Sequence, residues 1–339
     1  MRQLGFLDFD IRLNRIDKAG DPLKKINEAV EWEIFRPLLE EARRKEKKSQ
    51  AGAKGYDVIM LFKILILQSL YNLSDEALEY QILDRYSFSR FLGLHTASKV
   101  PDATTIWRFR EDLVRAGVVE ELFSRFDGYL QVHGYRARKG QIVDASIVKV
   151  PIQRNSREEN KQIKEGKPIE AWSEAKRRQK DTDARWVKKN GKHYFGYKNH
   201  ISVDVKGKFI RKYKVTAAHV HDSQIFEELL DSANTSKDIW ADSAYNSSEI
   251  RQGLEERGYR EHLQRKGCRN RKLSRRERQG NRTRSRIRSR VEHIFGVQAK
   301  RAGDLILRGV GIVRATARIG LRNLAYNLDR YGTLAWVQT

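Results

Sequence analysis

The pattern of apolar residues changes near Gly134, and this change restricts the chain to two dissimilar parts. Before it, apolar residues recur at helical spacing, and after it, short runs are rich in β-branched residues, as in strands. A chain of 339 residues has room for about two domains. We therefore predict an all-α domain over residues 1–135 and an α/β domain over residues 136–339.

The first part carries several helix signals. Asp21 stands before Pro22, a cap followed by a first-turn proline, and Pro37 must bend or interrupt the helix that follows. The segment between residues 45 and 55 is expected to be a loop. Further helices are expected at residues 57–71, 74–86, 104–117 and 118–132.

This helical domain is a candidate for DNA binding or assembly. Its short helices and the turn at residues 93–105 permit a helix-turn-helix, in which Arg108 and Arg110 would face a DNA groove. The alternative is a packing domain with a solvated arginine face.

The second part alternates strands and helices. A first strand is expected at residues 140–150 and a hairpin around the turn Lys206-Gly207. The predicted elements that follow are a helix at 222–233, a strand at 236–245, and helices at 247–258 and 282–301. This order is typical of an α/β layer architecture, and the charged segment at about residues 152–192 interrupts it as an insertion or mobile loop.

The charge of the chain indicates a polyanionic partner. The formal net charge is +24, and residues 260–290 hold fourteen Lys and Arg against two Glu. The apolar run at residues 58–71 is too short to span a membrane and is interrupted by Lys63 and Gln68. The first residues do not resemble a signal peptide, and Cys268 is the only cysteine. We expect a cytoplasmic, nucleoid-associated protein with no membrane partner.

Three carboxylates stand out by position. Asp144 and Asp242 each follow an apolar run, on or at the end of a strand, and Glu292 lies on a late helix after the basic region. A buried carboxylate is costly unless it is paired or bound to a metal ion. Oxygen ligands suit Mg²⁺, and two such ions about 4 Å apart can activate a nucleophile and stabilise the leaving oxygen of a phosphodiester.

Several stretches, in this order, resemble the catalytic domain of bacterial insertion-sequence transposases of the DDE type, and residues 52–123 are similar to the N-terminal domain of that family. The stretches are IVDASIV, GYKNHISVD, AAHVHDS, ADSAYNS and RSRVEHIFGV. The resemblance implies an RNase H-like mixed sheet flanked by helices, with Asp144, Asp242 and Glu292 as the catalytic, metal-binding carboxylates. It also implies two Mg²⁺ or Mn²⁺ ions, cleavage at terminal inverted repeats, joining to target DNA, and a homodimer or higher assembly on DNA.

The family signature around the glutamate is only partly present. It places a Tyr seven residues before the Glu, an Arg four before and a Lys seven after, all on one helix face. Arg288 holds the Arg place, whereas Ser285 and Ala299 replace the Tyr and the Lys. Lys300 follows one residue late, about 100° further round the helix.

Other basic residues are candidates for phosphate contacts. Either Lys300 or a neighbour such as Arg284 supplies the phosphate contact that the incomplete signature lacks, or the protein does without this contact. Lys198 shares one strand face with His200, where phosphate binding and simple exposure are equally open. The basic run from residue 260 to residue 290 is either part of the active site or a flexible arm that wraps DNA.

Three further features have ordinary explanations. Asp222 precedes a predicted helix, so an N-cap is favoured over a role in the site. Tyr245 is expected to be a packing residue, and the remaining histidines show no zinc spacing. Two alternative functions stay open: an RNase H-like nuclease without strand transfer, and a non-catalytic DNA-binding protein.

Overall fold

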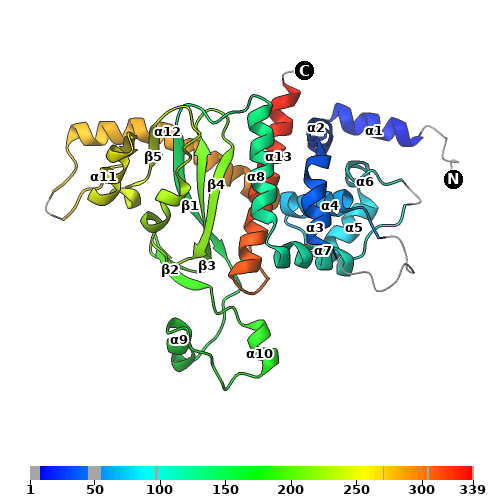
Figure 1. The fold of residues 1–339 in the computed structure, drawn as a ribbon, viewed down its shortest axis with the longest axis horizontal. Helices are drawn as coiled ribbons and strands as arrows, with labels where there is room; N and C mark the ends of the chain where they lie inside the picture. The colour runs from blue at the N-terminus through cyan, green and yellow to red at the C-terminus, as the bar shows by residue number, and fades with distance from the viewer. Residues whose placement is uncertain (1–7, 45–54, 96–97, 270, 304, 338–339) are drawn as a thin grey trace. The chain divides into compact units, whose positions relative to one another are not determined.

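The structure is a computed structural model that describes residues 8–44, 55–95, 98–269, 271–303 and 305–337. The chain forms two compact units, divided between residues 133 and 134 and again between residues 319 and 320 (Figure 1). We call the first the helical unit and the second, residues 134–319, the sheet unit. The last helix, α13 (Ile312–Trp336), begins in the sheet unit and ends in the helical unit.

The helical unit confirms the all-α prediction for the first part of the chain. Its elements are α1 (Asp8–Lys18), α2 (Pro22–Ala29), the 3-10 helix η1 (Trp32–Phe35), α3 (Arg36–Ala42), α4 (Val58–Tyr71), α5 (Asp75–Asp84), α6 (Tyr86–Leu92), α7 (Ala103–Ala116) and α8 (Val119–Val132). The Asp21 side chain accepts a hydrogen bond from the Leu23 N–H at 2.9 Å and caps α2, as predicted. Pro37 lies in the first turn of α3, where a missing N–H costs little. Apart from Gly55, the loop predicted at 45–55 lies outside the described residues.

The core of the helical unit is built around α4. This helix is apolar on nearly all sides, and its Phe62, Ile64 and Ile66 side chains are fully buried. Helices α3, α5, α6 and α7 pack against it. Among the described residues, no single helix has the length and composition of a membrane span; α4 and α5 meet that test only as a pair bent by 103°.

The structure assigns Arg110 a different role from the predicted DNA contact. Its two amino groups donate to both oxygens of Asp75 at 2.6 and 2.7 Å, and one of them also reaches Gln68. The connection between α6 and α7 runs from residue 93 to residue 102, longer than the three or four residues of a typical helix-turn-helix. Arg110 is thus a structural ion-pair residue that joins α7 to α5, whereas Arg108 is exposed on α7.

The sheet unit contains a mixed sheet with the RNase H-like arrangement. Its elements are β1 (Gln141–Lys149), α9 (Arg157–Lys164), α10 (Glu174–Gln179), β2 (Arg185–Lys189), β3 (Lys192–Asp204), β4 (Ile210–Ala217), η2 (Asp222–Ile225), η3 (Glu227–Leu229), β5 (Asp238–Ala241), η4 (Ser243–Tyr245), α11 (Ser248–Glu256), β6 (Arg260–Leu263) and α12 (Arg275–Ala302). The strand order is β2-β3-β1-β5-β6, and β4 also pairs with β3. Strands β1, β3 and β4 are antiparallel neighbours, while β5 and β6 run parallel to β1.

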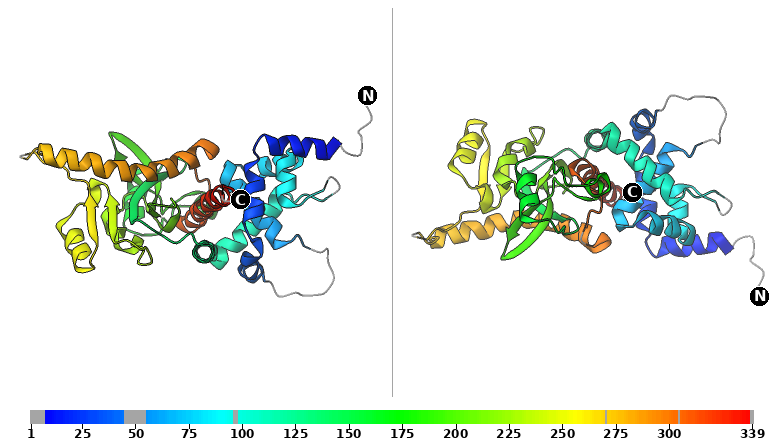
Figure 2. Two further views of the ribbon diagram at one scale, coloured as in Figure 1. Left: turned by 90° about the horizontal axis from the view of Figure 1, so that it is seen from above. Right: turned by 90° about the horizontal axis from the view of Figure 1, so that it is seen from below.

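Helix α12 runs along the sheet and packs on β1 and β5 (Figure 2). It begins at Arg275, earlier than predicted, because Ser274 and Glu277 form a reciprocal capping box. The helix therefore contains most of the basic region, so at least residues 275–290 belong to a regular helix rather than to a flexible arm.

The predicted helix at residues 222–233 is wrong. The chain forms two short 3-10 turns, η2 and η3, and then becomes extended at Leu230. The Phe226 and Leu229 side chains enter the core with Val143 and Tyr245. Packing under the sheet therefore overrides the local helical preference of this segment.

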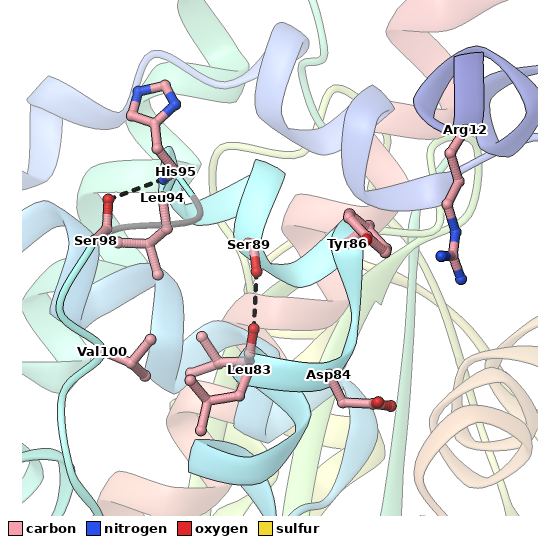
Figure 3. A pocket seen from close by; sticks show the side chains of 10 residues that line it. Arg12, Leu83, Asp84, Tyr86, Ser89, Leu94, His95, Ser98 and Val100 are labelled. Carbon is pink, nitrogen blue, oxygen red and sulfur yellow. Dashed lines mark hydrogen bonds between the residues drawn. The ribbon is translucent and has the colours of Figure 1, made fainter. Parts of the chain in front are cut away.

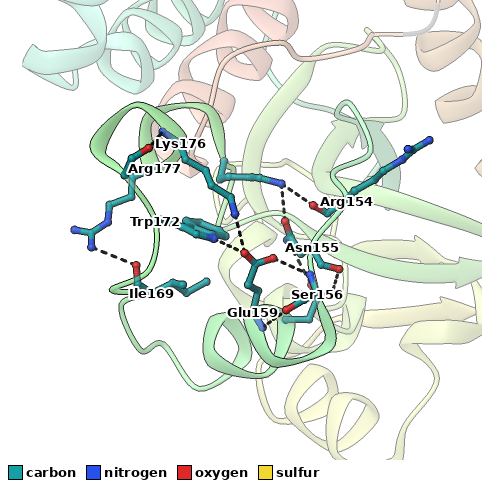
Figure 4. A network of polar contacts seen from close by, with 11 residues as sticks. Arg154, Asn155, Ser156, Glu159, Ile169, Trp172, Lys176 and Arg177 are labelled. Atoms are coloured by element: carbon teal, nitrogen blue, oxygen red, sulfur yellow. Dashed lines mark hydrogen bonds and ion pairs between the residues drawn. The ribbon is translucent and has the colours of Figure 1, made fainter.

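The charged segment after β1 is folded around one carboxylate (Figure 4). Glu159 accepts hydrogen bonds from Trp172 Nε1 at 2.5 Å and Lys176 Nζ at 2.9 Å, and it also closes the capping box of α9 with Ser156. The Lys176 ammonium is the main cause that lowers the pKa of Glu159 to about 2. With Trp172 and Ile169 buried, this segment is a small packed element and not an open loop.

Gly140 controls the approach of β1 to β5. Its φ is +83°, and a Cβ there would lie 2.4 Å from the Asp238 carbonyl oxygen. We expect Gly140→Ala to lower the free energy of unfolding by about 3 kcal/mol, because backbone strain and overlap add. Gly134→Ala is the control, since its φ of +84° is the same and its Cβ would meet nothing within 4 Å. Urea unfolding should show a loss of only about 1 kcal/mol for the control; equal losses would contradict this account.

Candidate active site

Asp144 and Asp242 occupy neighbouring positions at two parallel strands. The register pairs Val143 of β1 with Ala241, the last residue of β5, so the residue that follows in each segment is one of the two acids. Adjacent strands are about 4.8 Å apart, which brings the two carboxylates to the same edge. Asp242 also caps η4, where its side chain accepts from the Ala244 N–H at 2.7 Å.

Glu292 is connected to this pair through Arg288. The Arg288 guanidinium donates from Nη1 to Asp144 Oδ2 at 2.8 Å and from Nη2 to Glu292 Oε1 at 3.1 Å. Arg288 lies one turn before Glu292 on α12, so one cation joins a strand carboxylate to a helix carboxylate. The structure thus brings two of the predicted acids together directly and the third through an arginine.

The Asp144 carboxylate is the buried member of the site. Its side chain is 14% exposed, against 61% for Glu292. Burial raises the pKa of Asp144, and the neighbouring Asp242 adds to the rise. The Arg288 guanidinium and the Ala145 N–H act in the opposite direction. The site therefore favours a cation next to Asp144.

The three acids fit a hard divalent cation by their chemistry, because all their ligand atoms are carboxylate oxygens. The position beside Asp144 and Glu292 already holds a positive group, the Arg288 guanidinium. Among the described residues, no set of three or more His, Cys, Asp or Glu is placed to bind a metal ion. An ion held by Asp144 Oδ2 and Glu292 Oε1 would need the oxygens that now accept from Arg288.

Asp222 belongs to a second polar cluster near the acids, and its predicted N-cap role is wrong. His221 is the N-cap of η2, while Asp222 Oδ1 accepts from Lys198 Nζ at 2.8 Å. Lys198 also donates to the Val220 carbonyl at 2.7 Å, and its side chain is only 11% exposed. The Lys198 ammonium is therefore used inside the protein, which departs from both alternatives considered for it, phosphate binding and simple exposure.

His200 completes this cluster. It is fully buried; its Nε2 lies 2.8 Å from Thr216 Oγ1, and its Nδ1 lies 3.8 Å from Asp222 Oδ1 without a hydrogen-bond partner. Burial lowers the pKa of His200 to about 4, assisted by Lys198 and opposed by Asp222. The imidazole is therefore neutral at physiological pH.

Tyr245 is a buried phenol that feels the charges of both clusters. Its ring is buried in the core against Phe226, with ring centroids 5.2 Å apart, as expected of a packing residue. Burial is the main cause that raises the pKa of Tyr245, and the charges of Asp222, Asp144 and Asp242 add to it. The phenol therefore stays protonated and neutral near the three carboxylates.

Ser285, which occupies the place of the signature Tyr, makes a hydrogen bond within the protein. The Ser285 hydroxyl accepts from Gln264 Nε2 at 2.7 Å, which ties α12 to the chain directly after β6. Arg284 is half-buried, with its Nη1 3.5 Å from Asn281 in the same helix, and its Nε has no hydrogen-bond partner. The side chain of Lys300 lies outside the described residues.

The sequence did not single out the exposed arginines of α12 one by one. They are Arg275, Arg276, Arg278, Arg282 and Arg286. Only the periodicity of a continuous helix over this run would have identified them. Together they give α12 a strongly basic exposed surface on the same helix that carries Glu292.

A separate pocket lies within the helical unit (Figure 3). Arg12 stacks over the Tyr86 ring at 4.4 Å, and Ser89 Oγ donates to the Ile82 carbonyl at 2.8 Å. Among its described lining residues, Asp84 is the only carboxylate. This pocket therefore lacks the set of acids found beside β1.

The neutral state of His200 predicts a pH dependence of stability. The unfolded histidine titrates near 6.5 and the folded one near 4, so protons bind preferentially to the unfolded chain as the pH falls through this window. We expect the free energy of unfolding to drop by about 2 kcal/mol between about pH 7.5 and about pH 5 because of His200. The measurement is urea unfolding of the wild type and His200→Gln, whose curve should be flatter; identical slopes would contradict the assignment.

Comparisons with known proteins identify the family of this chain. The family model described as Transposase domain (DUF772) matches residues 11–112, and the one described as Transposase DDE domain matches residues 135–328. The chain is 30% identical, over 65% of its length and 75% of the relative's, to the transposase for insertion sequence element IS1106 of Neisseria meningitidis serogroup B. The cryo-EM structure of the piggyBac transposase synaptic complex with hairpin DNA aligns with 94% of this chain and 76% of that one, at 12% identity and a TM-score of 0.46. The second family model covers more than half of the chain, including all three acids, and the chain therefore belongs to the DDE transposase family.

Proposed function

We propose that this transposase cuts DNA at the terminal inverted repeats of an insertion sequence and joins the freed 3′ ends to target DNA. The observation that supports it most is the adjacent placement of Asp144 and Asp242, with Glu292 joined to Asp144 through Arg288. The relative from Neisseria meningitidis, a transposase for an insertion sequence element, supports the choice of substrate.

In this proposal Asp144, Asp242 and Glu292 hold two Mg²⁺ or Mn²⁺ ions. Such ions supply Lewis-acid stabilisation of the phosphodiester and a nucleophile activated at neutral pH. The protein contributes the orientation of the acids: β1 and β5 hold two of them in register, and α12 carries the third. Tyr245 is buried in the apolar core together with Val143 and Ala241, the residues that precede the two strand acids.

The exposed basic surface of α12 is proposed to hold the DNA backbone close to the acids. Arginine matches phosphate geometry well and keeps its charge at all physiological pH values. The helical unit is proposed to bind the DNA ends, with Arg108 as a contact, and to assemble the protein as a homodimer or higher oligomer on DNA. Such an assembly would hold two ends of one element together.

The role of Glu292 is tested by removing its charge. Glu292→Gln keeps the size of the side chain, so we expect DNA binding at low salt that equals or exceeds that of the wild type. Cleavage and joining should both fall by about 1,000-fold or more. Gel shift and product analysis on the same DNA, with Mg²⁺, measure the two effects.

Two outcomes would contradict the proposal. If Glu292→Gln cuts and joins at near wild-type rates, Glu292 is not the third acid. If the wild type remains fully active in excess EDTA, the two-metal reaction is wrong. A wild type that cuts without joining would instead be a nuclease of the same fold.

Arg108 and Arg110 form a matched pair for the helical unit. Arg108→Ala should leave the unfolding free energy within about 0.5 kcal/mol of the wild type and should reduce the preference for the element's ends over random DNA. Arg110→Ala should cost about 3 kcal/mol of stability, because it removes the guanidinium that balances the charge of the largely buried Asp75. Urea unfolding and competition gel shifts distinguish the two; an equal loss of binding to random DNA would make Arg108 a simple phosphate contact.

A further inference from the structure

We propose that the Arg288 guanidinium neutralises Asp144 and Glu292 in the DNA-free protein. A DNA phosphate must bind this guanidinium in place of the two carboxylates before they can bind a divalent ion. This inference rests on the proposed function, because it concerns the same three acids. It adds an order of binding: DNA first, metal second.

The Arg288 guanidinium bridges two of the three acids. Its two amino groups reach carboxylates on different elements, Asp144 of β1 at 2.8 Å and Glu292 of α12 at 3.1 Å. Both bonds are charge-assisted, which makes them stronger than neutral hydrogen bonds. Arg288 therefore holds two of the metal ligands in a closed arrangement.

A divalent ion and the Arg288 guanidinium compete for the same carboxylate oxygens. A divalent ion bound by Asp144 and Glu292 would need the oxygens that now accept from Arg288, and it would repel the guanidinium. An ion that binds the free protein therefore has to displace an arginine, which weakens its affinity.

Arg288 has one N–H donor, at Nε, that lacks an acceptor in the DNA-free protein. Arg288 Nε is buried and has no hydrogen-bond partner, so the side chain is one bond short in the DNA-free state. A phosphate offers several acceptor oxygens and can bind a guanidinium with two parallel bonds. The exposed Arg282 and Arg286 make the same helix attractive to a DNA backbone. A phosphate at Arg288 would satisfy the donor and release the two carboxylates together.

Binding of DNA and metal should then be mutually favourable, since each removes an obstacle to the other. Loss of Arg288 should abolish most of this coupling. It should also give the free protein a higher metal affinity than the wild type has, which a merely structural residue would not do.

The test is a titration of the full chain with Mn²⁺, followed by electron paramagnetic resonance of the free ion, with no DNA present. We expect Arg288→Gln to bind Mn²⁺ on the order of 10-fold more tightly than the wild type. Arg286→Gln is the matched control, because it removes the same charge from an exposed position two residues away. Equal affinity of the wild type and Arg288→Gln, or an equal gain in both variants, would overturn the proposal.

A second titration adds a random-sequence duplex of about 20 base pairs at low salt. The duplex should tighten Mn²⁺ binding to the wild type much more than to Arg288→Gln, and equal effects would overturn the proposal. Arg288→Lys is a second variant in case Arg288→Gln does not fold. Lysine keeps the positive charge but lacks the two amino groups that reach both carboxylates, so its Mn²⁺ affinity should lie between those of the wild type and Arg288→Gln. An affinity no higher than that of the wild type would count against the bridge.

Asp144→Asn separates failure of this inference from failure of the proposed function. If Asp144→Asn leaves Mn²⁺ binding unchanged in both the wild type and the Arg288→Gln background, the acids do not form a metal site and both proposals fall. If Asp144→Asn removes Mn²⁺ binding, yet Arg288→Gln equals the wild type, the metal site stands and only the exchange at Arg288 is wrong.

Discussion

Asp144 is a carboxylate in the middle of a buried strand, and the arrangement around it follows from the need to compensate its charge. A lone buried carboxylate would be unfavourable or would be protonated, as the raised pKa of Asp144 indicates. The Arg288 guanidinium supplies the compensation from α12. This ion pair fastens the long basic helix to the central strand and holds Glu292 close to Asp144.

The buried polar groups around His200 avoid an unpaired charge without Arg288. Lys198 and Asp222 form an internal ion pair, and His200 stays neutral because burial disfavours its charge. The Lys198–Asp222 pair joins the 3-10 turn η2 to strand β3. Turn η2 also lies next to η4, the turn that Asp242 caps.

Local signals in the sequence predicted most of the secondary structure. The caps at Asp21 and Ser74, the apolar run of α4 and the β-branched run of β1 act over a few residues, so they could be read directly. The helix predicted at residues 222–233 failed because Phe226 and Leu229 are taken into the core. The DNA contact predicted for Arg110 conflicts with the structure because Asp75, 35 residues away, binds its guanidinium.

For the candidate site, the residue types can be read from the chain alone: two acids that follow apolar runs, an acid on a basic helix, and the order of motifs that marks the family. Which of these groups meet depends on how the chain folds. The register of β1 with β5 sets Asp144 beside Asp242, and the packing of α12 sets Arg288 against Asp144, across 144 residues of sequence. Such contacts depend on long-range strand pairing and helix packing, and no local pattern in the chain encodes their geometry.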